Sequence, residues 1–326
     1  MTIGVVGGGA WGTALAQVLA SGGHEVRLWA REPEVIRAIN DDRENPLYLK
    51  GLALSPRIEA TDDIAWVGEA QAVLVVTPAQ HMRAVLADMP RHGQPLLLCS
   101  KGIEAGSHKF LHEVAREAVD GSPIAVLSGP TFAHEVAAGL PTAVTLAAED
   151  EALAARLADL IAQPHFRPYL STDVAGAEIG GAVKNVLAIA CGVVEGAGLG
   201  QNARAALISR GFAEMTRFGL ARGARPETLA GLSGLGDLVL TCSSTSSRNF
   251  SLGLGLGQGR SAAALLADRR TVAEGAFTAP VLREAAAAAA VDMPIVSAVC
   301  DLLDGSAAAR EVVERLLARP LKAEHA

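Results

Sequence analysis

The chain has few cysteines, and those it has lie far apart. Cys99, Cys191, Cys242 and Cys300 are the four among 326 residues, and none belongs to a C-x-x-C pair. This spacing argues against a disulfide or zinc framework and predicts reduced thiols in a cytosolic protein. No cluster of histidines and cysteines at metal-ligand spacing occurs, so we expect no metal site.

Basic blocks and uninterrupted apolar segments are also missing. The formal net charge is −7, and no run of lysines and arginines stands out, which argues against nucleic acid as a partner. An anionic substrate stays compatible with this charge, because local cations decide its binding. The most apolar stretch, residues 186–199, is interrupted by Glu195 and several glycines, so we expect no membrane span. No signal peptide is predicted, and we expect a cytoplasmic protein.

A glycine-rich turn near the N-terminus predicts a dinucleotide site. Residues 2–6 form a predicted strand, and Gly7, Gly9 and Gly12 then fit G-x-G-x-x-G before a helical segment. The first glycine makes the turn, the second lets a pyrophosphate approach the backbone, and the third lets the helix pack close to the strand. The helix N-terminus offers free N–H groups and a positive dipole end to the phosphates. A second strand at residues 25–29 completes a βαβ unit, which favours this interpretation over a plain structural turn.

The residues that follow the second strand bear on the choice of cofactor. An acidic residue there would hydrogen-bond the ribose 2′-OH of NAD. This chain has Arg31, whose guanidinium suits the 2′-phosphate of NADP. A solvated loop arginine is the alternative, with Glu32 beginning the next helix before Pro33. We therefore favour NADP and leave NAD open.

The hydrophobic pattern changes near residue 180. Before it, apolar runs alternate with helical segments, which predicts an α/β fold with a Rossmann domain, a doubly wound parallel sheet, over residues 1–180. After it, helical periodicity dominates, and we expect an all-helical substrate-binding and catalytic domain over residues 181–326. The predicted strands are residues 2–6, 25–29, 72–76, 95–99, 124–127 and 142–146. The helices predicted after residue 180 are 182–194, 203–222, 252–257, 261–268, 278–290, 294–303 and 307–318.

Two polar residues and one polar segment in the second half of the chain are candidates for a catalytic or binding role. Lys184 stands in an apolar, glycine-rich helix, where an unpaired buried lysine is costly; a lysine that extends to the surface is the alternative. Asp237 lies between glycines and an apolar run; a functional carboxylate is one interpretation, but the residues alone favour a helix cap, because Asp is a preferred capping residue. Residues 247–249, Ser-Arg-Asn, combine donors suited to a phosphate, although a solvated loop has the same composition.

Five segments together carry a family resemblance. In chain order they are residues 7–14 (GGGAWGTA), 127–133 (LSGPTFA), 180–185 (GGAVKN), 234–238 (GLGDL) and 247–249 (SRN). The chain resembles bacterial NAD(P)-dependent glycerol-3-phosphate dehydrogenase, and the match runs over nearly its whole length. The resemblance implies reversible reduction of dihydroxyacetone phosphate to sn-glycerol 3-phosphate for glycerophospholipid synthesis. It also implies a homodimer built from a Rossmann domain and a helical domain.

The resemblance assigns roles to individual residues. Lys184 is implied to be the proton donor and acceptor, Lys101 a second catalytic lysine, and Asp237 the carboxylate that orients Lys184. The implied substrate contacts are Lys101, Gly129, Thr131, Lys184, Asn185, Asp237, Ser247, Arg248 and Asn249. The implied cofactor contacts are Gly7, Gly9, Trp11, Gly12, Arg31, Lys101, Ala133, Arg248, Val272 and Glu274. Ala133 offers only a backbone or methyl contact.

Two other functions remain open at this point. Another two-domain dehydrogenase, of the β-hydroxyacid type, would share the glycine turn and a helical lysine but give no reason for Ser247, Arg248 and Asn249. A non-catalytic NADPH-binding regulatory module would not need Lys101, Lys184 and Asp237 together.

Overall fold

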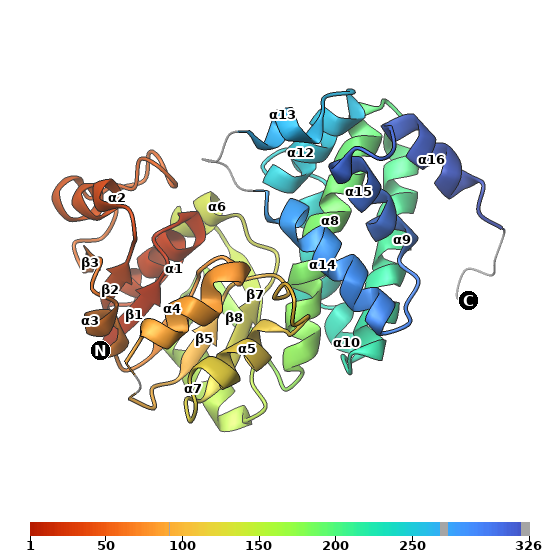
Figure 1. Ribbon diagram of the computed structural model, residues 1–326. Helices are drawn as coiled ribbons and strands as arrows, with labels where there is room; N and C mark the ends of the chain where they lie inside the picture. The colour runs from red at the N-terminus through yellow and green to blue at the C-terminus, as the bar shows by residue number, and fades with distance from the viewer. Residues whose placement is uncertain (91, 268–272, 321–326) are drawn as a thin grey trace. The chain divides into compact units, whose positions relative to one another are not determined.

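The structure is a computed structural model that describes residues 1–90, 92–267 and 273–320 (Figure 1). These residues pack into two compact units. The first unit comprises Met1–Gly181 and Gly223–Asp237, and the second comprises Ala182–Arg222 and Leu238–Ala326. The first unit is α/β and the second is helical, which confirms the predicted fold class. Gly223–Asp237 belongs to the first unit, whereas the sequence division assigns it to the second domain. We keep the boundary at residue 180 as a proposal.

The first unit is built on one eight-stranded sheet with the order β3-β2-β1-β4-β5-β6-β7-β8. The strands from β3 to β6 are parallel, as predicted. β7 runs antiparallel to β6, and β8 runs parallel to β7, so the far end of the sheet is reversed. The strands are β1 (Thr2–Val6), β2 (Glu25–Trp29), β3 (Ile58–Thr61), β4 (Val73–Val75), β5 (Leu96–Leu98), β6 (Ile124–Ser128), β7 (Thr142–Ala147) and β8 (Phe166–Ser171).

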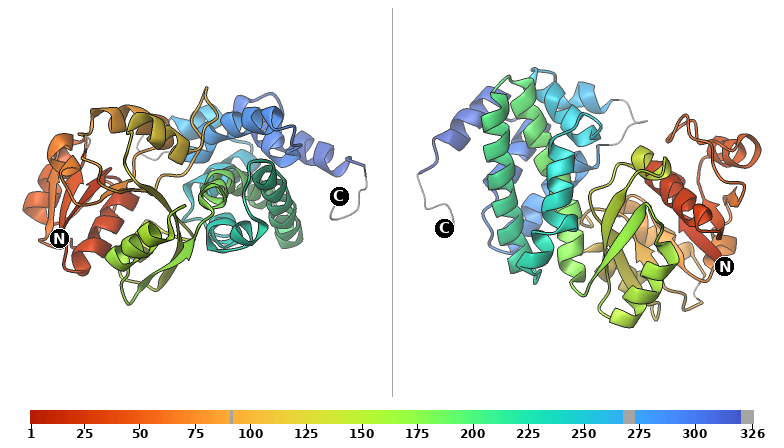
Figure 2. Two further views of the ribbon diagram at one scale, coloured as in Figure 1. Left: turned by 90° about the horizontal axis from the view of Figure 1, so that it is seen from below. Right: turned by 180° about the vertical axis from the view of Figure 1, so that it is seen from behind.

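Helices cover both faces of this sheet, which explains the continuous apolar runs of its central strands. In β4, Leu74 packs into one hydrophobic core while Val73 and Val75 pack into the other. α1 and α7 close the first core, and α4 and α5 close the second (Figure 2, left). The helices of this unit are α1 (Ala10–Ser21), α2 (Pro33–Arg37), α3 (Ile64–Gly68), α4 (Met82–Asp88), α5 (Leu111–Ala118), α6 (Ala133–Ala137), α7 (Glu151–Ile161) and α10 (Pro226–Leu229). Three short turns are η1 (Ala38–Asp42), η2 (Ala79–His81) and η3 (Leu232–Gly236).

The edge strand β8 was not predicted, because half of its residues are exposed and it includes Pro168. The carbonyls of His165 and Ser171 accept hydrogen bonds from Thr142 and Ala148, at the start and just past the end of β7. The even-numbered residues between them therefore turn their backbone N–H and carbonyl groups toward the free edge. Pro168 has no N–H to leave unpaired there, and Phe166 pairs its N–H and carbonyl with Gln163. Both features protect the edge from pairing with another strand.

The second unit is a set of helices packed around α8 and α9, which lie side by side (Figure 2, right). Each predicted helix is present with shifted bounds. The segment predicted at 182–194 is part of a longer helix that starts in the first unit, and residue 268 of the segment predicted at 261–268 lies outside the described residues. The helices are α8 (Val174–Gly196), α9 (Gly200–Ala221), α11 (Asp237–Cys242), α12 (Arg248–Gly257), α13 (Ala262–Leu266), α14 (Glu274–Ala288), α15 (Pro294–Asp304) and α16 (Ala309–Leu317).

α8 and α12 touch backbone to backbone along a seam of glycines. A Cβ on Gly192 would lie 2.0 Å from the carbonyl oxygen of Phe250, and a Cβ on Gly253 would lie 1.9 Å from that of Ile189. Gly196 and Gly257 repeat these contacts one turn further along each helix. Only glycine permits this approach, so the seam fixes where α12 lies on α8.

Among the described residues, one helix is long and apolar enough to span a membrane. This helix is α8, and its apolar window is wholly buried inside the protein. Such burial is typical of the core helix of a folded domain.

Candidate active site

The glycine-rich turn has the geometry that its pattern predicts. Gly7 has a φ of +134°, and a Cβ on Gly12 would lie 1.8 Å from the carbonyl oxygen of Gly7. A Cβ on Gly9, in contrast, would meet no atom within 4 Å. Gly7 and Gly12 are therefore required by the fold itself, whereas the open space at Gly9 is available to a ligand.

The N-terminus of α1 can accept an anion. Gly9 is its N-cap and supplies no side-chain hydrogen bond, so the N–H groups of the first turn point outward. The indole Nε1 of Trp11 is buried and finds no partner among the residues that the structure describes. This donor set and the space at Gly9 fit the pyrophosphate of a dinucleotide.

Asn45 holds this turn in place and was not predicted from the sequence. Its buried Nδ2 donates to the carbonyl oxygen of Gly8 at 3.0 Å and to Oγ1 of Thr13 at 2.8 Å. Its Oδ1 accepts the N–H of Tyr48. No local pattern marks this role of Asn45, because Gly8 and Thr13 lie more than thirty residues earlier in the chain.

The other predicted cofactor contacts differ in their surroundings. Arg31 lies two residues after the end of β2; its side chain is 78% exposed and lies 3.5 Å from the carboxylate of Glu32. Ala133 begins α6 in the first unit, and Glu274 begins α14 in the second. Val272 lies outside the described residues.

Lys101 and Asp237 form an ion pair at the carboxyl ends of the central strands. Nζ of Lys101 donates to Oδ2 of Asp237 at 2.6 Å and to the carbonyl oxygen of Gly129 at 3.2 Å. The Asp237 side chain is fully buried, and that of Lys101 is 14% exposed. Oγ1 of Thr131 donates to the same Gly129 carbonyl at 3.4 Å. Four of the predicted site residues are therefore joined in one cluster of the first unit.

Gly129 and the start of α8 complete this cluster. Gly129 has a φ of +158°, and a Cβ there would lie 2.9 Å from Cα of Val144, so the turn requires glycine. A Cβ on Gly180 would lie 1.9 Å from the carbonyl oxygen of Ser233, and one on Gly181 would lie 3.0 Å from Cγ of Lys101. The two glycines thus allow α8 to lie directly against η3 and Lys101. Lys184 follows on the same helix and is 6% exposed.

The predicted phosphate residues lie at the N-terminus of α12 in the second unit. Ser247 is the N-cap, and its hydroxyl accepts the N–H of Phe250. Arg248 is exposed. Asn249 is buried; its Nδ2 donates to Oδ1 of Asn185 at 3.0 Å, and its Oδ1 accepts the N–H of Gly275. The arginine is therefore open to a ligand, while the asparagine also holds three helices together.

The cysteines lie apart from one another inside the protein. All four cysteines are free and buried, and burial raises the pKa of the Cys300 thiol to about 11. Within residues 1–90, 92–267 and 273–320, no group of three or more histidine, cysteine or acidic side chains could hold a metal ion.

Two protein-family models match the chain. Residues 2–154 match the N-terminal part of NAD-dependent glycerol-3-phosphate dehydrogenase, and residues 173–314 match its C-terminal part. A glycerol-3-phosphate dehydrogenase (NAD(P)+) of Novosphingobium aromaticivorans is 67% identical over 324 residues, which are 99% of this chain and 98% of that protein. The chain belongs to the NAD-dependent glycerol-3-phosphate dehydrogenase family.

Further members of the glycerol-3-phosphate dehydrogenase family agree in sequence and fold. A glycerol-3-phosphate dehydrogenase (NAD(P)+) of Sphingopyxis alaskensis is 64% identical over 98% of this chain and 97% of that protein. The crystal structure of glycerol-3-phosphate dehydrogenase from Coxiella burnetii is 37% identical, covers 98% of this chain and 99% of its own, and has a TM-score of 0.93. The family resemblance inferred from the sequence is therefore confirmed.

Proposed function

We propose that this chain catalyses the reversible NAD(P)H-dependent reduction of dihydroxyacetone phosphate to sn-glycerol 3-phosphate. The observation that carries the proposal is the Lys101–Asp237 ion pair at the strand ends of a Rossmann unit. Carbonyl reduction in this family requires three features: this ion pair, a glycine-rich cofactor turn and Lys184 on the adjoining helix. The chain has all three. A non-catalytic cofactor-binding module would not need them.

The reduction places negative charge on the carbonyl oxygen of the substrate. When bound, the nicotinamide supplies the hydride to the carbonyl carbon. In our proposal the ammonium group of Lys184 stabilises the growing charge and delivers the proton to that oxygen. Lys101 adds a second positive charge beside the substrate. The buried carboxylate of Asp237 balances the cations and holds Lys101, and the family resemblance implies that it also orients Lys184.

The phosphate of the substrate would be held at the N-terminus of α12. Arg248 supplies a charge-assisted contact, and Ser247 and Asn249 lie on either side of it in the chain. One Nδ2 hydrogen of Asn249 is used by Asn185, which leaves the other for a phosphate oxygen. Binding at the phosphate would orient the carbonyl toward the nicotinamide and thereby raise the rate.

We also propose the finer properties that the resemblance implies. Gly7, Gly9, Trp11 and Gly12 would hold the cofactor pyrophosphate, and Arg31 would favour NADP over NAD. Gly129, Thr131 and Asn185 would contact the substrate, and Ala133, Val272 and Glu274 the cofactor. The enzyme would act as a cytoplasmic homodimer in glycerophospholipid synthesis. Sedimentation of the purified protein tests the dimer.

The decisive experiment is NADPH oxidation with dihydroxyacetone phosphate, followed by absorbance, for the wild type and Lys184→Ala. We expect turnover by the wild type and a loss on the order of 10²–10⁴-fold in the variant. NADPH affinity, measured by fluorescence, should be unchanged. Absence of wild-type turnover despite NADPH binding would favour the regulatory module, and near-normal kcat in the folded variant would remove Lys184 from its role.

A further inference from the structure

We infer that Gln80 and Arg83 form a clamp that positions Lys101 for the reaction, an inference that rests on the proposed function. Lys101 lies in the connection between β5 and α5, which spans residues 99–110 and contains no helix or strand. A connection of this length would give a reactive side chain little positional restraint unless other elements held it.

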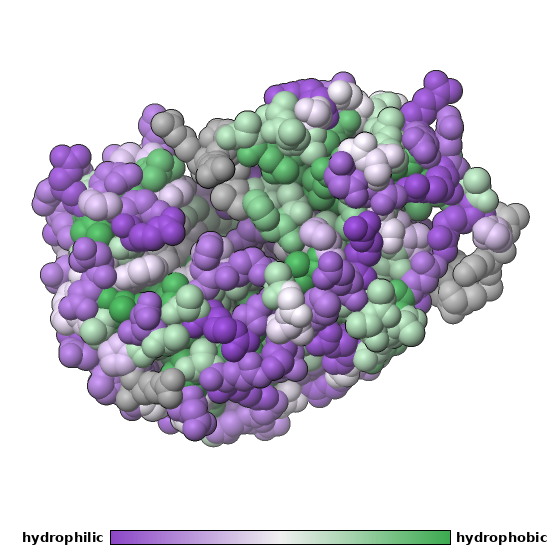
Figure 3. Space-filling model, in the orientation of Figure 1, coloured by the Kyte–Doolittle hydropathy of each residue, from purple (hydrophilic) through white to green (hydrophobic). Residues whose placement is uncertain are grey.

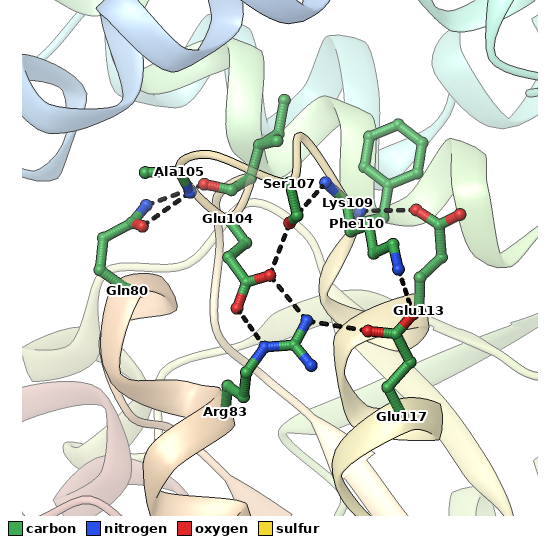
Figure 4. Close-up of polar contacts among 10 residues, drawn as sticks. Gln80, Arg83, Glu104, Ala105, Ser107, Lys109, Phe110, Glu113 and Glu117 are labelled. Atoms are coloured by element: carbon green, nitrogen blue, oxygen red, sulfur yellow. Dashed lines mark hydrogen bonds and ion pairs between the residues drawn. The ribbon is translucent and has the colours of Figure 1, made fainter.

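Gln80 binds the backbone of this connection on both sides of Glu104. Its Nε2 donates to the carbonyl oxygen of Ile103 at 2.8 Å, and its Oε1 accepts the N–H of Ala105 at 2.9 Å (Figure 4). The side-chain amide of Gln80 thus fixes the backbone two and four residues after Lys101.

Arg83 binds the side chain of Glu104 between those two contacts. Its Nε and one terminal nitrogen donate to the two carboxylate oxygens of Glu104 at 2.8 and 2.7 Å (Figure 4). The same terminal nitrogen lies 3.0 Å from Glu117 on α5. These hydrogen bonds from Arg83 hold the pKa of Glu104 below its usual value, so the pair stays charged. A two-bond contact fixes orientation as well as distance.

Contacts inside the connection carry this restraint along the chain. The N–H of Glu104 donates to the carbonyl of Lys109, and Ile103 pairs with Phe110 as an isolated antiparallel bridge. Ser107 donates to the Glu104 carboxylate. The segment from Ile103 to Phe110 is therefore one closed unit, and Gln80 and Arg83 attach it to η2 and α4.

The other end of the restraint is the ion pair already described. Lys101 precedes the closed segment by two residues and reaches Asp237 and the Gly129 carbonyl with its Nζ. Residues of η2 and α4 have no direct contact with the reacting atoms in this proposal, so Gln80 and Arg83 are positioning residues.

A contribution to stability alone is the alternative explanation. The side chain of Arg83 is 40% exposed, and hydrophilic residues (purple) cover much of the surface drawn in Figure 3. Ion pairs at such positions contribute little to stability. Because the two explanations differ in what they predict for Lys101, they can be separated by experiment.

The experiment compares Arg83→Met and Arg83→Lys in the full-length enzyme. For Arg83→Met we expect kcat to fall on the order of 10-fold to 10²-fold with NADPH affinity unchanged, because misplacement of a catalytic group lowers the rate. Arg83→Lys keeps the positive charge but not the two-bond contact of the guanidinium with Glu104, so its loss in kcat should be intermediate. The rate at which an amine-reactive reagent labels Lys101, measured by peptide mass spectrometry, should rise in Arg83→Met as Lys101 is released.

Arg116→Gln is the matched control. It breaks the ion pair between Arg116 on α5 and Glu149, whose arginine is 47% exposed, close to the 40% of Arg83, and whose carboxylate lies outside residues 99–110. This variant should keep wild-type kcat and labelling. Unchanged kcat and labelling in folded Arg83→Met would overturn the clamp. Because labelling needs no turnover, failure of the proposed reaction would be seen separately, as a wild type without activity.

Discussion

The side chain of Asn249 on α12 donates from Nδ2 to Oδ1 of Asn185 on α8 at 3.0 Å. Its Oδ1 accepts the N–H of Gly275 on α14 at 2.9 Å. A Cβ on Gly275 would lie 2.6 Å from the carbonyl oxygen of Asn185, so glycine is needed for this close contact. One buried amide therefore joins three helices. The residues next to these three in the chain are those with proposed roles: Lys184, Arg248 and Glu274.

Asn249→Asp tests this junction. The variant keeps the shape of the side chain but replaces the donor to Asn185 with an acceptor. We expect a loss of about 1–3 kcal/mol in the free energy of unfolding and a lower kcat, measured by denaturant titration and NADPH oxidation. Asn202→Asp makes the same change at an exposed position of α9 and should affect neither. Equal behaviour of the two variants would show that the junction is not needed.

Gly253→Ala tests the glycine seam between α8 and α12. The added methyl would lie 1.9 Å from a backbone oxygen of α8, so the helices must separate. We expect a cost of about 1–3 kcal/mol in the free energy of unfolding. Gly255→Ala is the control on the same helix, because its methyl would meet only the flexible end of Leu265 at 2.6 Å. If both variants lose the same stability, helix contact is not the cause.

Cofactor choice should respond to Arg31. Arg31→Asp places a carboxylate at the end of β2, where it would repel a 2′-phosphate and could accept a hydrogen bond from a 2′-hydroxyl. We expect the Kd of NADPH to rise far more than that of NADH, measured by titration of nucleotide fluorescence. An equal change for both cofactors would show that Arg31 does not contact the 2′-phosphate.

Glu214 on α9 should make stability depend on pH. Its carboxylate accepts the N–H groups of Ile295 and Val296 at the start of α15, yet burial raises its pKa from 4.5 to about 7. Because the folded state binds this proton more tightly, the contribution is fully present below pH 4.5 and is lost as the pH rises to about 7. We expect the free energy of unfolding of the wild type, relative to Glu214→Gln, to fall across this range in urea titrations. A difference that is constant with pH would contradict the assignment.

Arg248→Ala tests the phosphate contact. Loss of a charge-assisted contact should cost about 1.5–3 kcal/mol, raising KM for dihydroxyacetone phosphate and lowering kcat. Unphosphorylated dihydroxyacetone, a poor substrate, should be almost unaffected. An equal fall in kcat/KM for both substrates would mean that Arg248 acts on the fold or on the cofactor instead.

The sequence by itself determined the features that depend on neighbouring residues. The glycine pattern from Gly7 to Gly12 determined the cofactor turn, because Gly7 and Gly12 answer steric demands inside that turn and Gly9 leaves space for a ligand. The apolar runs that became β4 and β5 determined buried parallel strands, because residues on both faces must be apolar when helices cover both sides. Family motifs also identified Lys101, Gly129, Thr131 and Asp237, which the structure brings together.

Only the tertiary structure decided the features that depend on distant segments. β8 has exposed residues and a proline, and it is a strand because β7 pairs with it. The reversed direction of β7 has no local pattern, since hydrophobic periodicity is the same for either direction. Asn45 holds the glycine-rich turn through its hydrogen bonds to Gly8 and Thr13, which are distant in the chain. Asp237 is paired with Lys101, 136 residues away, because two chain segments meet at the carboxyl ends of the central strands. Such pairings follow from how elements pack, which local sequence does not encode.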